Sequence, residues 1–144
     1  MTSPIQSLEV SYLVHSTEDK ERIDSAVEDT LGIKAPMTTE ELAGHFGNRI
    51  VHVSCRLTGG AASSAFMGLA QRLSSSARKE LVGSLGETLD EHSTLYIRLD
   101  RQSLVKGEIA LGGREPIRVR VKPRLFQMKE GATGFFKRTL EGTA

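Results

Sequence analysis

Alternating apolar and polar residues predict extended strands in several parts of the chain. In residues 7–15, four apolar side chains share one face, as expected of a strand with one buried side: Leu8, Val10, Tyr12 and Val14. The same period of two runs through residues 49–57, 94–100 and 116–125, with a shorter candidate at 108–111. Pro123 has no backbone N–H to donate, so it predicts an edge position or the end of pairing in the last strand.

Helical patterns lie between these strands. The segment after the first strand repeats apolar residues at helical spacing: Ile23, Ala26, Val27 and Leu31. Ser16 can cap the start of this helix, and Gly32 can end it. Two consecutive helices are predicted within residues 59–89, separated by the serines at 74–76. Strands and helices in this order predict a sheet that carries its helices on one side.

The segment 44–48 (GHFGN) lies between two extended segments. Its glycines and its asparagine can adopt positive φ angles, so the simplest interpretation is a hairpin connection. His45 and Phe46 could then be displayed at the tip, with Arg49 beside them to contact a phosphate. A purely structural turn and a turn that also contacts a ligand both remain open at this point.

The length and composition are those of one folded domain. The chain has 144 residues, of which 38% are hydrophobic and 26% charged, ordinary values for a soluble globular protein. We expect one domain over residues 1–125 and a tail over 126–144, in which Phe135 and Phe136 could dock a short helix. The single cysteine, Cys55, cannot form an internal disulfide. No apolar run approaches the ~20 residues of a membrane span, and no signal peptide is evident, so we expect a cytoplasmic protein without membrane contact.

Charge is divided unevenly along the chain. Residues 1–48 contain three Lys or Arg and nine Asp or Glu, a net charge of −6. Residues 92–144 contain eleven Lys or Arg and five Asp or Glu, a net charge of +6. The overall net charge of +1 conceals this asymmetry. A basic half of this kind suggests an anionic partner.

The last predicted strand concentrates positive charge on one face. Four cationic residues alternate with its apolar residues: Arg118, Arg120, Lys122 and Arg124. Alternate residues of a strand lie ~6.6 Å apart, comparable to successive phosphates of a nucleic acid. Arg98 and Arg56 would extend the row if they share this face, and Tyr96 would add a stacking surface for an unpaired base. The alternative is an ordinary solvated face whose charge is neutralised by Glu108 and Glu115.

The residues that could perform catalysis form no recognisable motif. His15, His45, His52 and His92 show neither HxH nor HExxH spacing, and one cysteine cannot complete a zinc set. No GxSxG elbow or GxxxxGK[ST] phosphate loop occurs. Cys55 lies among apolar strand residues, which favours a buried thiol over a nucleophile. We therefore expect no metal, no cofactor and no enzyme.

Three short segments stand in a distinctive order along the chain. They are 14–19 (VHSTED), 44–48 (GHFGN) and 95–102 (LYIRLDRQ), continued by 106–108 (KGE) and 116–119 (PIRV). In order and spacing they resemble small archaeal RNA-binding proteins predicted to be exosome subunits. The resemblance covers residues 7–125. The glycine- and serine-rich middle helices and the tail containing FFKR depart from the family pattern.

This resemblance implies an α+β fold like that of the ribosomal protein that binds five-S RNA, with a mainly antiparallel sheet and helices packed on one face. It also implies RNA binding in RNA processing or in ribosome-related work, with no assigned reaction. Expected partners are structured or single-stranded RNA and components of the exosome or the ribosome.

The leading hypothesis is a non-catalytic RNA-binding protein. Phosphate contacts are expected from Arg98, Arg101, Lys106, Arg118, Arg120, Lys122 and Arg124, with His45, Phe46 and Arg49 contributing at the hairpin. One alternative is a protein-interaction adaptor whose acidic helix and basic strand contact an RNA-processing assembly. The other is a small hydrolase or nuclease that uses His45, His52 or His15.

Overall fold

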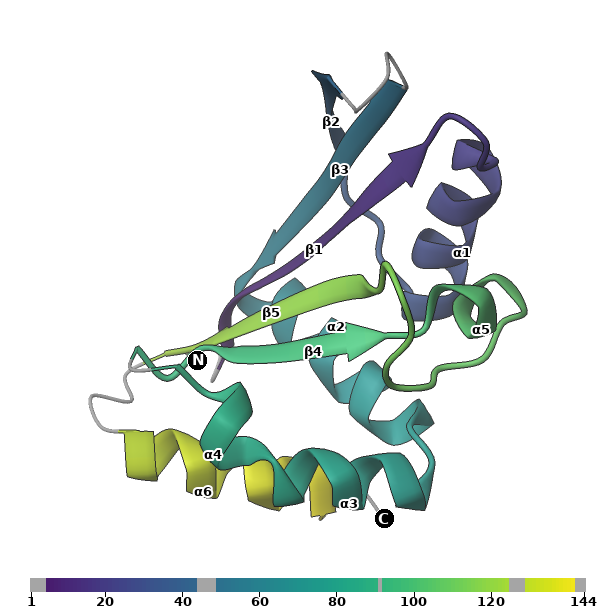
Figure 1. Cartoon of the computed structure of the whole chain (residues 1–144). Helices are drawn as coiled ribbons and strands as arrows, with labels where there is room; N and C mark the ends of the chain where they lie inside the picture. The colour runs from purple at the N-terminus through teal and green to yellow at the C-terminus, as the bar shows by residue number, and fades with distance from the viewer. Residues whose placement is uncertain (1–4, 44–48, 91, 125–128, 142–144) are drawn as a thin grey trace.

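The computed structural model describes residues 5–43, 49–90, 92–124 and 129–141. At its centre is a sheet of five strands in the order β2-β3-β1-β5-β4 (Figure 1). The strands are β1 (Ile5–His15), β2 (Thr38–Ala43), β3 (Arg49–Thr58), β4 (Leu95–Leu99) and β5 (Ile117–Pro123). Every neighbouring pair is antiparallel, which confirms the predicted α+β class with an antiparallel sheet.

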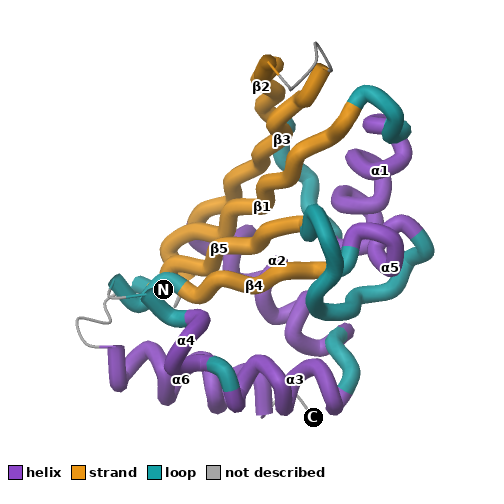
Figure 2. Tube along the Cα trace, in the orientation of Figure 1, coloured by secondary structure: helices purple, strands orange, loops and turns teal. Residues whose placement is uncertain are grey.

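Helices cover one face of the sheet and leave the other face open (Figure 2). They are α1 (Lys20–Leu31), α2 (Gly59–Arg72), α3 (Ser75–Gly83), α4 (Leu85–Thr88), α5 (Arg101–Val105) and α6 (Lys129–Glu141). Helix α2 packs against β1 and β3. The strand residues that face the helices, such as Val10, Val53 and Val119, are buried. Burial of this apolar side is the main force that holds the two layers together.

Local sequence sets the helix ends, with one correction. Asp19, and not Ser16, caps α1, and its carboxylate accepts a hydrogen bond from the backbone N–H of Arg22 at 3.2 Å. The helix begins later than predicted because the chain first makes a turn, in which the N–H of Glu18 donates to the carbonyl of His15 at 2.9 Å. Gly32 ends α1 with a φ of 67°, as predicted.

Two further predictions about local structure need correction. Residues 108–111 do not form a strand, because only Leu111 makes an isolated bridge, to Leu99. The predicted second middle helix is divided at Ser84 into α3 and α4. Pro123 is the last residue of β5, a strand with neighbours on both sides, so it ends the pairing and does not mark an edge strand.

The C-terminal part of the chain contributes to the core through α6. Its Ala132, Phe136 and Leu140 are fully buried. The Phe136 ring meets the Phe66 ring of α2 edge to face, with centroids 5.6 Å apart. Figure 1 shows α6 running beside α3, and residues of the two helices are in contact. The tail therefore does more than cover the surface, since it completes the apolar layer beneath the sheet.

The segment 44–48, with His45 and Phe46, lies outside the described residues. The two strands next to it pair directly, with Ala43 opposite Arg49. These strands are therefore the two arms of a hairpin. None of the helices described here is long and apolar enough to cross a membrane.

Candidate functional site

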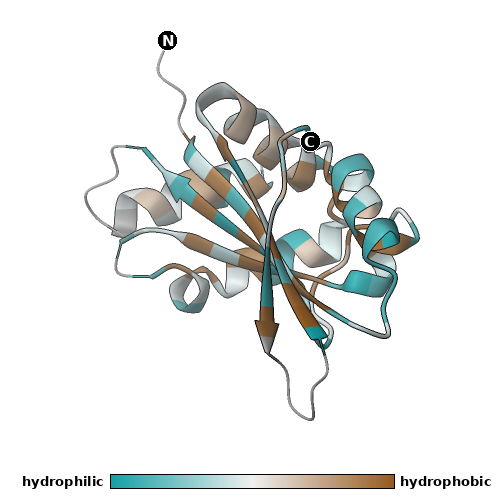
Figure 3. Cartoon of the chain, turned by 90° about the horizontal axis from the view of Figure 1, so that it is seen from above, coloured by the Kyte–Doolittle hydropathy of each residue, from teal (hydrophilic) through white to brown (hydrophobic). Residues whose placement is uncertain are grey.

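The open side of the sheet carries two adjacent rows of polar side chains. Across β3, β1, β5 and β4, one row consists of Arg56, Glu9, Arg120 and Tyr96, and the next consists of Ser54, Ser11, Arg118 and Arg98. Lys122 stands opposite Ser7 in a third row. Figure 3 shows the alternation of hydrophilic and hydrophobic residues along the strands that produces this arrangement. We call this surface the basic face, defined by Arg56, Arg98, Arg118, Arg120 and Lys122.

Arg98 and Arg118 are direct cross-strand neighbours on the basic face. They occupy paired positions of β4 and β5, and both side chains are exposed. Like charges placed directly opposite each other destabilise a sheet. Among the described residues, neither guanidinium has a carboxylate partner. The fold thus maintains a repulsive pair of cations that a bound anion would relieve.

Arg120 and Tyr96 form an ordered pair next to these arginines. The Arg120 guanidinium carbon lies 5.5 Å from the centre of the Tyr96 ring, and Nη1 lies 3.5 Å from the Glu9 carboxylate. The Tyr96 hydroxyl donates to Asp90 at 3.1 Å, while 40% of the residue stays exposed. Burial raises the pKa of Asp90, but hydrogen bonds from two backbone N–H groups and from Tyr96 outweigh it and hold that pKa below its usual value. Asp90 is therefore ionised at neutral pH and fixes the ring.

The middle of the basic face is hollowed. A depression of about 600 Å³ is lined by Glu9, Ser11, His52, Tyr96, Ile97, Arg98, Arg118, Val119 and Arg120. Glu9 is the acidic residue in this lining. The two carboxylates that could neutralise this face lie elsewhere, because Glu115 pairs with His15 and Glu108 is exposed in the loop after α5. The depression is consequently rich in uncompensated positive charge.

Four of the cations predicted to contact RNA lie elsewhere. Arg101 is only 7% exposed, and its Nη1 donates to both carboxylate oxygens of Glu18, at 2.8 and 2.9 Å. Arg49 projects to the other side of the sheet, because it alternates in phase with the buried Val53, and it pairs with Glu41 at 2.5 and 2.9 Å.

Lys106 and Arg124 are the other two. Lys106 follows α5, where it lines a hollow with Glu18 and Arg22, away from the open sheet. Arg124 lies beyond the end of β5 and is half-buried. Of the cations predicted to contact phosphates, Arg98, Arg118, Arg120 and Lys122 thus share the basic face, and Arg56 extends the row from β3.

The open side of the sheet also carries residues to which the sequence pattern gave no binding role. Glu9 and Ser11 are the outward residues of β1, and the alternation of that strand could have identified them. His52, considered only as a catalytic residue, joins the depression from β3. Their neighbours on β4 and β5 come from distant parts of the sequence, so only the strand order brings them together.

Comparison with known proteins identifies the family. A family model described as RNA binding matches residues 7–123. The chain belongs to this RNA-binding family. It is 32% identical over 133 residues to the RNA-binding protein PAB1135 of Pyrococcus abyssi, covering 88% of this chain and 86% of that protein.

Two solved structures are similar to this member of the RNA-binding family over nearly their whole length. Protein AF2318 from Archaeglobus fulgidus is 28% identical, with a TM-score of 0.81 and coverage of 94% of this chain and 99% of that one. Mth689 from Methanothermobacter thermautotrophicus is 25% identical, with a TM-score of 0.76 and coverage of 94% and 98%. The sheet and helices described above are therefore shared with these proteins.

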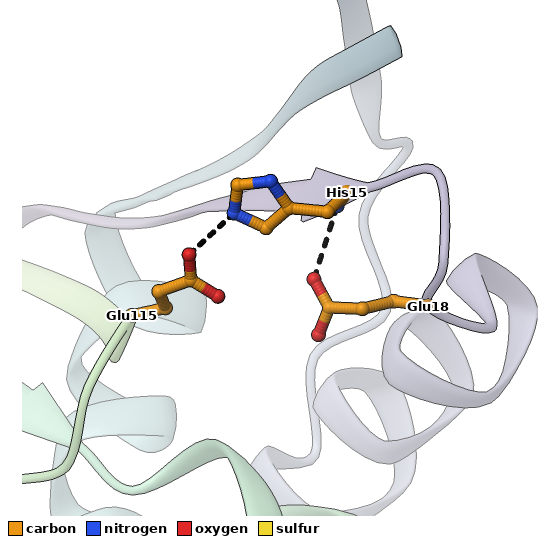
Figure 4. A group of neighbouring side chains, drawn as sticks. All are labelled: His15, Glu18 and Glu115. Atoms are coloured by element: carbon orange, nitrogen blue, oxygen red, sulfur yellow. Dashed lines mark hydrogen bonds and ion pairs between the residues drawn. The ribbon is translucent and has the colours of Figure 1, made fainter. Parts of the chain in front are cut away.

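This RNA-binding family member also brings His15, Glu18 and Glu115 together at the end of β1 (Figure 4). His15 Nε2 lies 2.5 Å from Glu115 Oε1, and the backbone N–H of His15 donates to Glu18 at 3.0 Å. The potential ligand atoms lie within 4.8 Å of one another. Imidazole and carboxylate groups can bind a metal ion. Here, however, the Arg101 guanidinium is hydrogen-bonded to both carboxylate oxygens of Glu18, and the positive charge of Arg101 would repel a cation. The group instead ties the start of α1 and the chain before β5 to β1.

Glu18→Gln should weaken the fold at neutral pH, and the loss should shrink in acid. Burial raises the pKa of Glu18, but hydrogen bonds from His15 and Arg101 and the charge of Arg101 hold that pKa below its usual value of 4.5. A lowered pKa stabilises the fold above the pKa of the unfolded chain, and this contribution disappears as pH falls through the folded value. Urea unfolding of both proteins over a pH series measures the difference. A difference that does not change with pH would contradict this role.

Proposed function

We propose that this protein binds RNA through the basic face, with Arg98, Arg118, Arg120 and Lys122 contacting phosphates. The observation that carries the proposal is the cross-strand pair of Arg98 and Arg118, exposed and without a carboxylate partner among the described residues. A phosphate placed between two guanidinium groups would replace their repulsion with charge-assisted hydrogen bonds. Membership in the RNA-binding family supports RNA as the anion.

The proposed contacts are mainly electrostatic. Phosphate contacts position a protein on a nucleic acid without reading its sequence. Modest sequence specificity and strong salt dependence are therefore expected. Ser11 and Ser54 lie in the same row as the two arginines, where their hydroxyl groups can hydrogen-bond to ribose or phosphate.

The proposed cellular role is a non-catalytic accessory function in RNA processing or degradation, in association with the exosome, or in ribosome-related RNA metabolism. Support comes from the resemblance of the ordered segments to predicted exosome subunits and from the RNA-binding relative in Pyrococcus abyssi. The protein would present RNA to an assembly that supplies the chemistry.

A second candidate is an adaptor that contacts a protein of the same assembly. It is favoured by the exposed acidic side of α1, where Glu21, Glu28 and Asp29 lie away from the basic face. A partner with a basic surface would fit this side. Co-purification that survives nuclease treatment and is lost on replacing these three residues with serine would support the adaptor.

The test of RNA binding is a salt series with the double variant Arg98→Ala/Arg118→Ala. If each arginine neutralises one phosphate, the slope of log K against log salt should flatten by about 1.4 for single strands and about 1.8 for a duplex. Arg22→Ala is the matched control, because Arg22 is an exposed arginine on the helix side. Fluorescence anisotropy with labelled RNA measures both quantities. An unchanged slope and affinity in the folded double variant would overturn the proposal.

A further inference from the structure

The basic face has an aromatic ring on each side of its central depression. Tyr96 of β4 and His52 of β3 both line it, with Arg98, Arg118 and Ser11 between them. Tyrosine and histidine rings are stacking surfaces for nucleic-acid bases. The cations between the two rings are therefore placed to contact the sugar-phosphate backbone of a nucleic acid whose bases stack on those rings.

Strand order and register together set the distance between the two rings. Strands β3 and β4 are separated by β1 and β5, so three interstrand steps lie between them. At ~4.8 Å per step, the two strands are about 14 Å apart. His52 also lies four residues along β3 from Arg56, the residue in the row of Tyr96, which adds ~13 Å along the strand and gives a diagonal of roughly 20 Å. An extended strand of a few nucleotides crosses such a distance. The rows of the sheet therefore offer a path across the strands, from Tyr96 over the arginines to His52.

Tyr96 is organised before any ligand binds. Its hydroxyl is held by Asp90, and Arg120 lies against its ring while contacting Glu9. A side chain that is already ordered loses little conformational entropy on binding. The Arg120 guanidinium lies over the Tyr96 ring and is itself a stacking surface, since bases stack on arginine as well as on aromatic residues.

A duplex cannot use these rings. Its bases are paired and stacked on one another, so an A-form helix presents phosphates and ribose hydroxyls and keeps its base faces hidden. Only unpaired nucleotides can place bases on Tyr96 and His52. We infer that the basic face binds single-stranded RNA, with one base stacked on Tyr96, another on His52, and the intervening phosphates on Arg98 and Arg118. This inference rests on the proposed function and specifies the class of RNA.

The experiment compares a short unstructured RNA with a blunt RNA duplex that has the same number of phosphates. Tyr96→Leu and His52→Leu should each weaken binding of the single strand roughly 5- to 150-fold. They should change duplex binding less than about twofold, because a duplex offers phosphates and ribose hydroxyls and hides its base faces. Tyr96→Phe is the matched control that keeps the ring, and it should retain most of the affinity. A 2-aminopurine base in the single strand should be quenched by the wild-type protein and less by Tyr96→Leu.

The outcomes separate this inference from the proposed function. Weaker binding of both probes in Arg98→Ala/Arg118→Ala, with no effect of the Tyr96 and His52 variants, would overturn stacking and leave phosphate binding in place. Equal losses on single strand and duplex in the aromatic variants would also overturn it. If the arginine and aromatic variants all bind like wild type, both proposals fail. Thermal melting of each variant establishes that it is folded.

Discussion

Replacing Arg98 with glutamate should remove most of the RNA affinity while making the fold slightly more stable. The substitution turns a repulsive cross-strand pair with Arg118 into an attractive one, worth about 1 kcal/mol or less on an exposed sheet surface. The same change removes one phosphate contact, worth roughly 1.5–3 kcal/mol. The new carboxylate would also pair with Arg118 and compete with phosphate for it. We therefore expect RNA affinity to fall by about 100-fold or more.

A gain in stability together with a loss of RNA affinity distinguishes loss of an RNA contact in Arg98→Glu from general destabilisation of the fold. Urea unfolding gives the stability, and anisotropy at fixed salt gives the affinity. Arg22→Glu makes the same change of charge on the helix side and controls for the altered net charge. Full RNA affinity in Arg98→Glu, or a loss of affinity accompanied by a less stable fold, would contradict the role assigned to the arginine pair.

Phe136→Ala should produce the largest loss of stability. The Phe136 side chain is fully buried and packs edge to face against Phe66, so its removal leaves a cavity between α6 and α2. Phenylalanine-to-alanine changes in protein cores cost about 3–5 kcal/mol, a large share of the roughly 5–15 kcal/mol that stabilises a typical domain. Urea unfolding at neutral pH measures the loss.

Phe135→Ala is the matched control for this prediction. Phe135 is the adjacent residue of α6 and is only partly buried, so its removal should cost clearly less. Equal effects of the two changes, or a negligible effect of Phe136→Ala, would show that α6 is not part of the cooperative core. RNA binding by folded Phe136→Ala protein should be retained, since α6 contributes no residue to the basic face.

The strands could be predicted because their alternation is a local property. Residues 7–15 and 116–125 each showed one apolar side, and β1 and β5 occupy these segments with that side buried. The segment 108–111 was a wrong prediction for the same reason. Its pattern is short, and glycines with positive φ, Gly107 at 85° and Gly112 at 97°, turn the chain on both sides before pairing can extend.

The arginines show that local sequence patterns predict the exposure of some side chains and not of others. Alternation in β5 correctly placed Arg118 and Arg120 opposite the core. It could not reveal that Arg101 is buried against Glu18, because their contact joins residues far apart in sequence. The group of His15, Glu18 and Glu115 was missed because Glu115 is far from the other two residues in sequence.

The sequence by itself determined where the long strands and the main helices lie and which side of each strand is apolar, because these depend on spacings of two to four residues. It also determined the basic character of β5. Only the tertiary structure decided that β5 lies between β1 and β4, so that Arg98 meets Arg118 and Tyr96 meets Arg120. Strand order depends on how the apolar sides of distant segments pack on the same helices, and that packing energy belongs to the whole chain.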